Sequence, residues 1–164
     1  MSAIIAGDSA PQFELPGTDG KTYSLADALR GGPVLAAFFK VSCPTCQFTF
    51  PFLERIYEAY GDGKMTFWAV SQDDARDTRD FCREFEVAFP ALTDDEGYPA
   101  SNAYGLTNVP SIFLIGQDGK VQVSCVGFSR ADLETIAAAA AQAAGKTAQA
   151  LFAPGEIVPD HKPG

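Results

Sequence analysis

The sequence Cys-Pro-Thr-Cys at residues 43–46 constrains the fold of this chain more than any other feature, because of what flanks it. An apolar run at residues 34–39 precedes it, and a run with helical periodicity at residues 47–60 follows it. A short apolar run bounded by turn signals is typical of a buried strand. A helix that starts at this point surrounds the first sulfur with free N–H groups at the positive end of its dipole, where a thiolate is stabilised. We therefore expect a pair of cysteines that exchanges between dithiol and disulfide.

Strand and helix patterns alternate along the rest of the chain. The expected strands cover residues 10–15, 21–23, 34–39, 65–70, 111–115 and 121–126, and the expected helices cover residues 25–29, 47–60, 74–85, 100–104 and 130–144. Such alternation indicates parallel strands in a sheet that is covered by helices. The first two strands form an N-terminal β-hairpin, which is expected to add an antiparallel edge. The pattern predicts an α/β fold with a central mixed β-sheet flanked by helices.

The length of the chain, 164 residues, fits one domain with a sizeable core. We place this domain at residues 1–144 and find no internal repeat and no second boundary. Residues 145–164 contain several prolines and no helical pattern, so they are expected to form an extended C-terminal tail.

Charge and the N-terminal sequence bear on partners and location. The formal net charge of -9 argues against nucleic acid or an anionic membrane as a partner, because both bind clustered Lys and Arg. No apolar run approaches the roughly 18 residues of a membrane span. Residues 1–8 lack the basic and apolar segments of a secretory leader. We expect a cytoplasmic protein.

The chain has four cysteines, which is not the disulfide framework of a small secreted protein. Cys82 and Cys125 stand alone and are expected to pack in or near the core. The alternative for the close-spaced pair is a zinc site completed by these two cysteines. Zinc sites usually take their ligands as two close-spaced pairs, and the chain has no second pair. Redox exchange is therefore favoured, with no metal and no cofactor.

Three motifs give the chain a resemblance to a known family. They are Ala-Pro-Gln-Phe at residues 10–13, Ser-Cys-Pro-Thr-Cys at residues 42–46, and Val-Pro-Ser-Ile-Phe-Leu-Ile at residues 109–115. Together with the order of elements, they resemble the thioredoxin fold over roughly residues 8–144. Within that fold, the N-terminal hairpin and the extra helix look like the redoxin branch. This branch contains the peroxiredoxins and the thiol-disulfide oxidoreductases of cytochrome maturation.

The resemblance implies roles for the residues of the Cys-x-x-Cys motif. Cys43 is the attacking thiol, and Cys46 is the resolving thiol that releases the reduced substrate. Pro44 restrains the loop at an early helical position where its missing N–H costs little. Pro44 and Thr45 are both expected to contribute to substrate binding.

Val109 and Pro110 match a second position of the family. In thioredoxin-like proteins a cis proline before the third core strand lies opposite the dithiol. The residue before that proline offers its backbone to an incoming substrate chain, in the manner of an added strand. The resemblance therefore implies that Val109 and Pro110 bind substrate.

The chain departs from the family at three positions near the dithiol. Ala37 stands where thioredoxins carry a buried Asp, and Thr49 stands where the cytochrome-maturation group often carries a Glu. Ser42 replaces the usual Trp before the first cysteine. Either missing carboxylate would help to deprotonate the second cysteine, so only water or Lys40 is left as a proton acceptor for Cys46.

The expected function is that of a thiol-disulfide oxidoreductase, with a disulfide-containing protein or small molecule as substrate and an unidentified thiol or reductase as electron donor. One alternative is a peroxiredoxin-like thiol peroxidase with an antioxidant role. Its signature, Pro-x-x-x-Thr-x-x-Cys, does not fit, because Ala36 and Lys40 hold the Pro and Thr positions relative to Cys43. Relative to Cys46, the same positions hold Phe39 and Cys43. The other alternative is a non-enzymatic redox-sensing domain.

Overall fold

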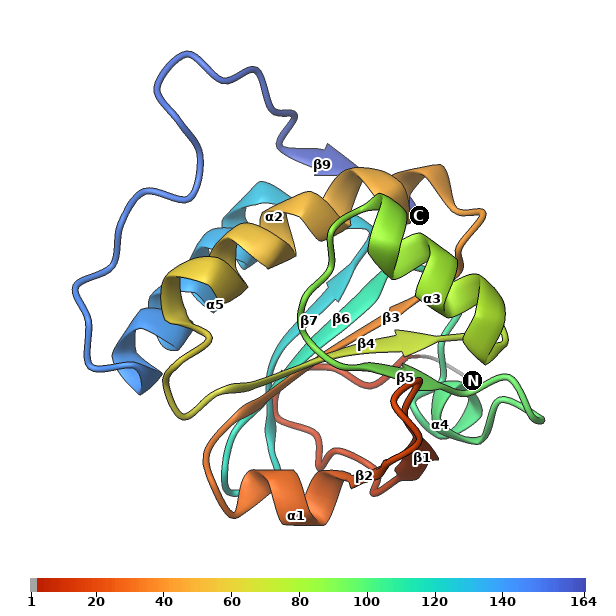
Figure 1. Cartoon of the computed structure of the whole chain (residues 1–164). Coiled ribbons are helices and arrows are strands. Elements are labelled where there is room, and N and C mark those ends of the chain that lie inside the picture. Colours follow the sequence, from red (N-terminus) through yellow and green to blue (C-terminus); the bar gives the residue numbers. More distant parts are fainter. Residues whose placement is uncertain (1–2) are drawn as a thin grey trace.

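The computed structural model describes residues 3–164, and a five-stranded sheet forms its centre (Figure 1). Its strands are β3 (Val34–Phe39), β4 (Thr66–Ser71), β5 (Ala91–Thr93), β6 (Ser111–Ile115) and β7 (Val121–Val126), in the spatial order β5-β4-β3-β6-β7. β3, β4 and β5 are parallel, whereas β6 runs antiparallel to both of its neighbours. The predicted mixed sheet is therefore confirmed, and the strand that leads to the dithiol lies in its middle.

All six residues of β3 are buried, because helices cover both faces of the sheet (Figure 1). Leu35 and Phe39 belong to one apolar core, formed with α2 (Pro44–Tyr60), α3 (Ala75–Glu84) and α5 (Arg130–Ala143). Val34 and Phe38 belong to the other core, formed with α1 (Leu25–Leu29) and α4 (Pro99–Ala103). Successive strand residues point to opposite faces, so a strand covered on both sides reads as a continuous apolar run.

The predicted N-terminal hairpin is present as β1 (Glu14–Pro16) and β2 (Thr22–Ser24). The expectation that it adds an antiparallel edge to the main sheet is wrong, because the two strands form a separate sheet. An isolated bridge between Gly17 and Leu92 links it to β5. The rings of Phe13 and Tyr23 lie 5.8 and 6.0 Å from the ring of Trp68. The hairpin therefore meets the edge of the main sheet through this bridge, while its aromatic side chains pack on one face of the sheet.

Strand β5 lies in residues 89–108, where the sequence pattern predicts only a short helix. It pairs in parallel with β4 over three residues and forms one edge of the sheet. A three-residue strand that directly follows Pro90 carries too short a pattern to be recognised, since periodicity needs several residues to show.

Residues 145–164 contain no helix and form a wide loop that returns to the domain near residue 160 (Figure 1). Phe152 is 7% exposed, and Leu151 and Val158 pack against the core that includes α2 and α5. Near the end of the chain, β9 (His161–Lys162) pairs antiparallel with β8 (Phe128–Ser129). Leu151, Phe152 and Val158 supply apolar surface that is buried against the domain, which explains why this part of the segment packs on it.

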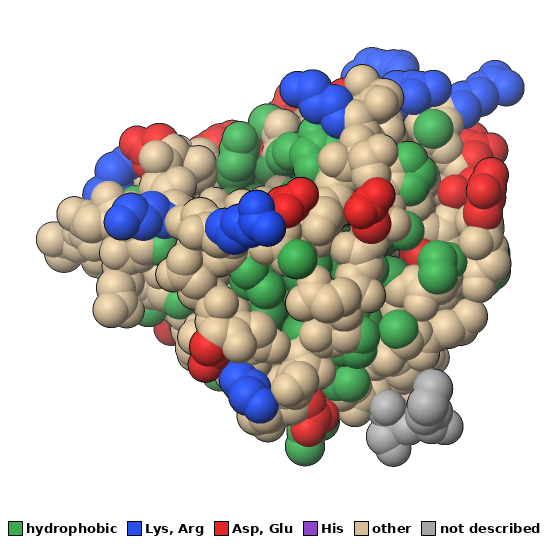
Figure 2. All heavy atoms as spheres, turned by 90° about the horizontal axis from the view of Figure 1, so that it is seen from below, with side chains coloured by type: hydrophobic (Ala, Val, Ile, Leu, Met, Phe, Trp, Pro, Cys, Tyr) green, Lys and Arg blue, Asp and Glu red, His purple; other side chains and the backbone are tan. Residues whose placement is uncertain are grey.

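The surface agrees with the mixed composition of the chain. On the face seen in Figure 2, acidic and basic side chains are interspersed among hydrophobic and neutral ones. Within residues 3–164, no helix has both the length and the apolar character needed to cross a membrane. Residues 1 and 2 of the N-terminal segment discussed above lie outside the described residues.

Candidate active site

The loop between β3 and α2 is held from two sides at Val41. The N–H of Val41 donates a hydrogen bond of 2.8 Å to Asp73 Oδ2. The carbonyl of Val41 accepts a hydrogen bond of 2.9 Å from Gln47 Nε2. Because both backbone groups are bound, the loop has a fixed path into the first turn of α2, where Cys43 lies.

Asp73 is a residue that the sequence analysis missed. The pair Asp73-Asp74 is typical of a helix cap followed by solvated charge, and Asp74 does cap α3 by accepting from the N–H of Asp77 at 2.8 Å. Asp73 instead turns to the loop after the neighbouring strand. The available signal was its position just after β4, because the carboxyl ends of adjacent parallel strands meet at one edge of a sheet.

Cys43 is the N-cap of α2, with extended backbone angles and Pro44 at the start of the helix. Its Sγ accepts a hydrogen bond of 3.1 Å from the N–H of Cys46, and the residue is half-buried. This is the position where the free N–H groups and the dipole of a helix stabilise negative charge. The Cys43 sulfur, predicted to attack, thus belongs to a half-buried residue and receives a hydrogen bond from the N–H of Cys46.

Cys46 lies one turn further into α2 and is fully buried. Burial, followed by the hydrogen bond with the Cys43 thiol, raises the pKa of the Cys46 thiol well above its ordinary value. Both cysteines are free thiols in this structure. The buried Cys46 thiol, one turn from the half-buried Cys43, is placed to attack the Cys43 sulfur after that sulfur has formed a mixed disulfide with a substrate.

Val109 and Pro110 lie beside Cys43, although 66 residues separate them in the sequence. The Cys43 thiol donates to the carbonyl oxygen of Val109 at 3.5 Å. The peptide bond between Val109 and Pro110 is cis, as the resemblance implied. The fold therefore brings together the two motifs expected to form the site.

A cavity of about 220 Å³ has Val109 in its lining. Its lining consists of Lys40, Gln72, Leu106, Thr107, Asn108 and Val109. These residues come from the ends of β3 and β4 and from the loop before Pro110, so the cavity lies next to the dithiol. Most of its lining is polar, which suits the polar groups of a peptide or another hydrophilic substrate.

Thr45, the remaining residue predicted to contact substrate, is buried at 8% exposure. Its hydroxyl donates a hydrogen bond of 2.8 Å to the carbonyl oxygen of Pro163. The position expected to face a substrate thus faces the C-terminal segment of the same chain.

The positions of the two missing carboxylates hold no acid. Ala37 is buried in the core next to α2, and Thr49 donates to the carbonyl of Thr45 at 2.6 Å. The buried carboxylate of α2 is Glu54, which accepts from the N–H of Ala88 at 2.9 Å. Eight residues at 1.5 Å per residue place Glu54 about 12 Å along the helix from Cys46. Burial raises the pKa of Glu54, but this carboxyl group lies too far along α2 to take a proton directly from the dithiol.

The other two cysteines lie away from the dithiol. Cys82 is half-buried on α3, where burial and the negative charge of Glu54 raise its pKa to about 11. Cys125 is buried on β7, and burial raises its pKa to about 12. In the part of the chain that the structure describes, no three His, Cys, Asp or Glu residues lie close enough together to hold a metal ion.

Comparisons with known proteins agree with this architecture. A family model described as Redoxin matches residues 5–142. The thiol-disulfide oxidoreductase ResA of Geobacillus thermodenitrificans is 29% identical to this chain over 127 residues, which are 77% of this chain and 72% of ResA.

Solved structures give the same result. A crystal structure described as a thiol:disulfide interchange protein DsbE from Chlorobium tepidum superimposes with a TM-score of 0.72 at 31% identity, over 82% of this chain and 94% of that one. The peroxidoxin BcpB of Mycobacterium tuberculosis superimposes with a TM-score of 0.71 at 22% identity, over 85% of this chain and 97% of that one, which is a likeness of fold alone.

Proposed function

Because the chain belongs to the redoxin family and is a thiol-disulfide oxidoreductase, we propose that it reduces or exchanges disulfides of proteins or small molecules through Cys43 and Cys46. One observation carries the proposal. Cys43 is a half-buried residue whose Sγ accepts the N–H of Cys46 at 3.1 Å and lies 3.5 Å from the carbonyl oxygen of Val109. A sulfur in this setting is accessible to a substrate and has a backbone group beside it that can hold the substrate chain.

In the first step the Cys43 thiolate attacks one sulfur of the substrate disulfide. A bond forms between Cys43 Sγ and that sulfur, the substrate S–S bond breaks, and the second substrate sulfur leaves as a thiolate. The N–H of Cys46 stabilises the negative charge on Cys43 before attack. Val109 and Pro110 orient the substrate so that its disulfide lies in line with Cys43.

In the second step Cys46 loses its proton and attacks Cys43 Sγ. The mixed disulfide breaks, a Cys43–Cys46 disulfide forms, and the remaining substrate sulfur leaves. The substrate gains two electrons and the enzyme dithiol loses them. The proton released by Cys46 balances the proton taken up by the first substrate thiolate, and the remaining substrate sulfur leaves as a thiolate, so charge and protons balance.

Insulin reduction with dithiothreitol tests this proposal. The wild-type protein is expected to accelerate precipitation of the reduced insulin chains, and Cys43→Ala is expected to abolish the acceleration. A wild-type rate no higher than that of dithiothreitol alone contradicts the proposal.

The two alternatives predict other outcomes in the same set of experiments. A thiol peroxidase consumes peroxide at a rate like that of dedicated peroxidases, and loses this activity in Cys43→Ser. A redox-sensing domain forms a reversible disulfide between Cys43 and Cys46 but shows little turnover with any disulfide.

The direction of electron flow depends on the reduction potential of the Cys43–Cys46 couple. A potential near the thioredoxin value of about -270 mV makes the protein a reductant, and one near about -120 mV makes it an oxidant. We propose a reductant supplied by a thiol or a reductase, in the cytoplasmic location expected from the sequence. Cell fractionation and a glutathione redox titration test these two points.

A further inference from the structure

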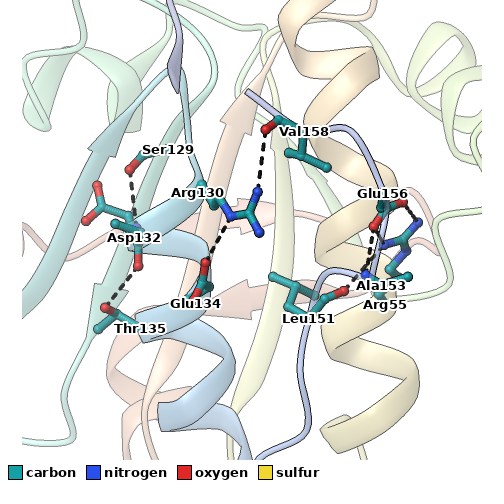
Figure 3. Close-up of polar contacts among 11 residues, drawn as sticks. Arg55, Ser129, Arg130, Asp132, Glu134, Thr135, Leu151, Ala153, Glu156 and Val158 are labelled. Atoms are coloured by element: carbon teal, nitrogen blue, oxygen red, sulfur yellow. Dashed lines mark hydrogen bonds and ion pairs between the residues drawn. The ribbon is translucent and has the colours of Figure 1, made fainter. Parts of the chain in front are cut away.

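The segment that follows α5 forms a wide loop and returns to the domain at β9, which lies beside the N-terminal half of α2 (Figure 1). In its middle, Phe152 inserts beside Phe52 and Phe128, with ring centroids 5.2 and 6.4 Å away. Arg55 on α2 binds both carboxylate oxygens of Glu156, at 2.8 and 2.7 Å (Figure 3). These contacts fix the segment to the domain before it reaches the active site.

The last residues continue from this anchor as an added strand. The guanidinium group of Arg130 donates to the carbonyl of Val158 at 3.5 Å (Figure 3), and the backbone N–H of Arg130 donates to the carbonyl of Asp160 at 2.9 Å. β9 then pairs with β8, and the ammonium group of Lys162 lies 4.6 Å from the ring centroid of Phe48 on α2. The chain is thereby directed along the first turns of α2 toward the dithiol.

Pro163 and Gly164 lie in the space between α2 and the loop of Pro110. The carbonyl of Pro163 accepts from Thr45, one of the two residues between the cysteines. Gly164 lies so close to Val109 that a Cβ at position 164 would overlap the Val109 carbonyl oxygen. This is the same oxygen that accepts the Cys43 thiol hydrogen. Residues 163 and 164 therefore contact both sides of the site in which a substrate chain is expected to bind.

The glycine at position 127 makes this approach possible. A Cβ on Gly127 would overlap the carbonyl oxygen of Lys162, and Gly127 has a positive φ of 79° that favours glycine. The N–H of Gly127 donates to the carbonyl of Pro110 at 2.8 Å. The turn at Gly127 therefore borders the space between α2 and the loop of Pro110, which we call the groove. The groove is thus built from backbone that accepts another extended backbone at close range.

Resting on the proposed function, we propose that residues 160–164 hold the place of an extended polypeptide substrate, and that protein substrates must displace them to reach Cys43. The substrate class is therefore a protein segment in extended conformation, with a small residue at the position of Gly164. Small disulfides need only to reach the sulfur of the half-buried Cys43, so their reaction is little affected by this segment. Because the anchor at Phe152 is separate from the strand, β9 can leave the groove while the rest of the segment stays docked.

Single-turnover oxidation of the pre-reduced protein tests the proposal. The wild type, a deletion of residues 160–164, and Gly164→Val are mixed with insulin or with glutathione disulfide, and formation of the Cys43–Cys46 disulfide is followed by acid quench and mass spectrometry. Gly164→Val removes the fit to Val109 without shortening the chain. His161→Ala is the matched control, because that side chain is exposed on the same strand. The deletion and Gly164→Val, here called the displacing variants, are expected to react about tenfold faster with insulin than the wild type. This factor corresponds to ~1.4 kcal/mol that the wild-type segment costs a competing protein substrate.

The rate with glutathione disulfide is expected to stay unchanged in all variants, and His161→Ala is expected to match the wild type with both substrates. A second measurement compares alkylation of Cys43 by iodoacetamide and by a bulky polyethylene-glycol maleimide. The displacing variants should accelerate only the bulky reagent.

Two results contradict the inference while the proposed function stands. One is an active wild type whose insulin rate is unchanged or reduced in both displacing variants. The other is equal acceleration with insulin and glutathione disulfide, which indicates a general change in Cys43 rather than displacement. Failure of the proposed function looks different, because then no variant reacts with either disulfide.

Discussion

Asp73→Ala tests whether the clamp on Val41 positions the attacking cysteine. The substitution leaves the N–H of Val41 without the 2.8 Å hydrogen bond that it makes to the carboxylate in a partly buried setting. Hydrogen bonds to charged groups contribute about 1.5–3 kcal/mol, so we expect the free energy of unfolding to fall by about 2 kcal/mol. For a chain of this size, that corresponds to a decrease in Tm of about 4–8 °C.

The same change is expected to slow the reaction of Cys43. A loop released at Val41 no longer holds Cys43 at the N-cap of α2, where it accepts the N–H of Cys46. We expect about 1 kcal/mol of the lost hydrogen-bond energy to have held Cys43 in its reactive position, so the alkylation and insulin-reduction rates should fall about fivefold. Asp73→Asn keeps an accepting oxygen without the charge, so its free energy of unfolding is expected to fall by about half as much as that of Asp73→Ala. Its alkylation and insulin-reduction rates are expected to stay close to those of the wild type.

The assays are urea unfolding and the rate of iodoacetamide alkylation at Cys43, followed by mass spectrometry. Asp74→Ala is the matched control, since it removes the cap of α3 at the next residue and costs about 1 kcal/mol without touching the loop. The reasoning is refuted if Asp73→Ala reacts at Cys43 as fast as the wild type, or if Asp74→Ala slows the reaction equally.

Three further predictions concern the rest of the molecule. Hydrogen bonds from Arg55 lower the pKa of Glu156 to about 2, so the stability from this pair is present above pH ~4.5 and is lost as the pH falls toward 2. The free energies of urea unfolding of the wild type and Glu156→Gln should therefore differ at pH 7 and converge at low pH. A difference that stays constant with pH contradicts the assignment. Phe50→Ala removes a fully buried ring that lies 4.6 Å from the ring of Phe39, so it should lower the free energy of unfolding by about 3–5 kcal/mol, and a loss below about 1 kcal/mol would show that the site is not tightly packed. Cys82→Ser should keep the insulin-reduction rate of the wild type, and a large loss of rate would assign Cys82 to the redox couple.

The centre of the fold was predictable because local signals agreed there. The apolar run of β3 ends at Phe39, the loop is short, and Cys43 and Pro44 are suited to the N-cap and first position of a helix. Each of these signals lies within a few residues of the next. Local strand patterns likewise predicted β6 and β7.

The contacts that complete the site were not predictable, because they depend on segments far apart in the sequence. Asp73 had two plausible uses, and only the position of the neighbouring strand decides between the cap of α3 and the clamp on Val41. Phe152 gives no periodic signal among alanines and prolines, so its docking on α2 depends on the shape of a surface that the sequence does not display. The hairpin likewise packs on Trp68 through aromatic rings and joins the sheet edge through the bridge between Gly17 and Leu92, instead of continuing the sheet.

Trapping of the mixed disulfide tests the central claim most directly. A Cys46→Ser variant can attack a substrate disulfide but cannot resolve the product, so it should accumulate a covalent adduct with glutathione disulfide. Peptide mapping by mass spectrometry is expected to place one glutathione on Cys43 and to leave Cys82 and Cys125 free. An adduct on another cysteine, or no adduct at all, would contradict the assignment of Cys43 as the attacking thiol.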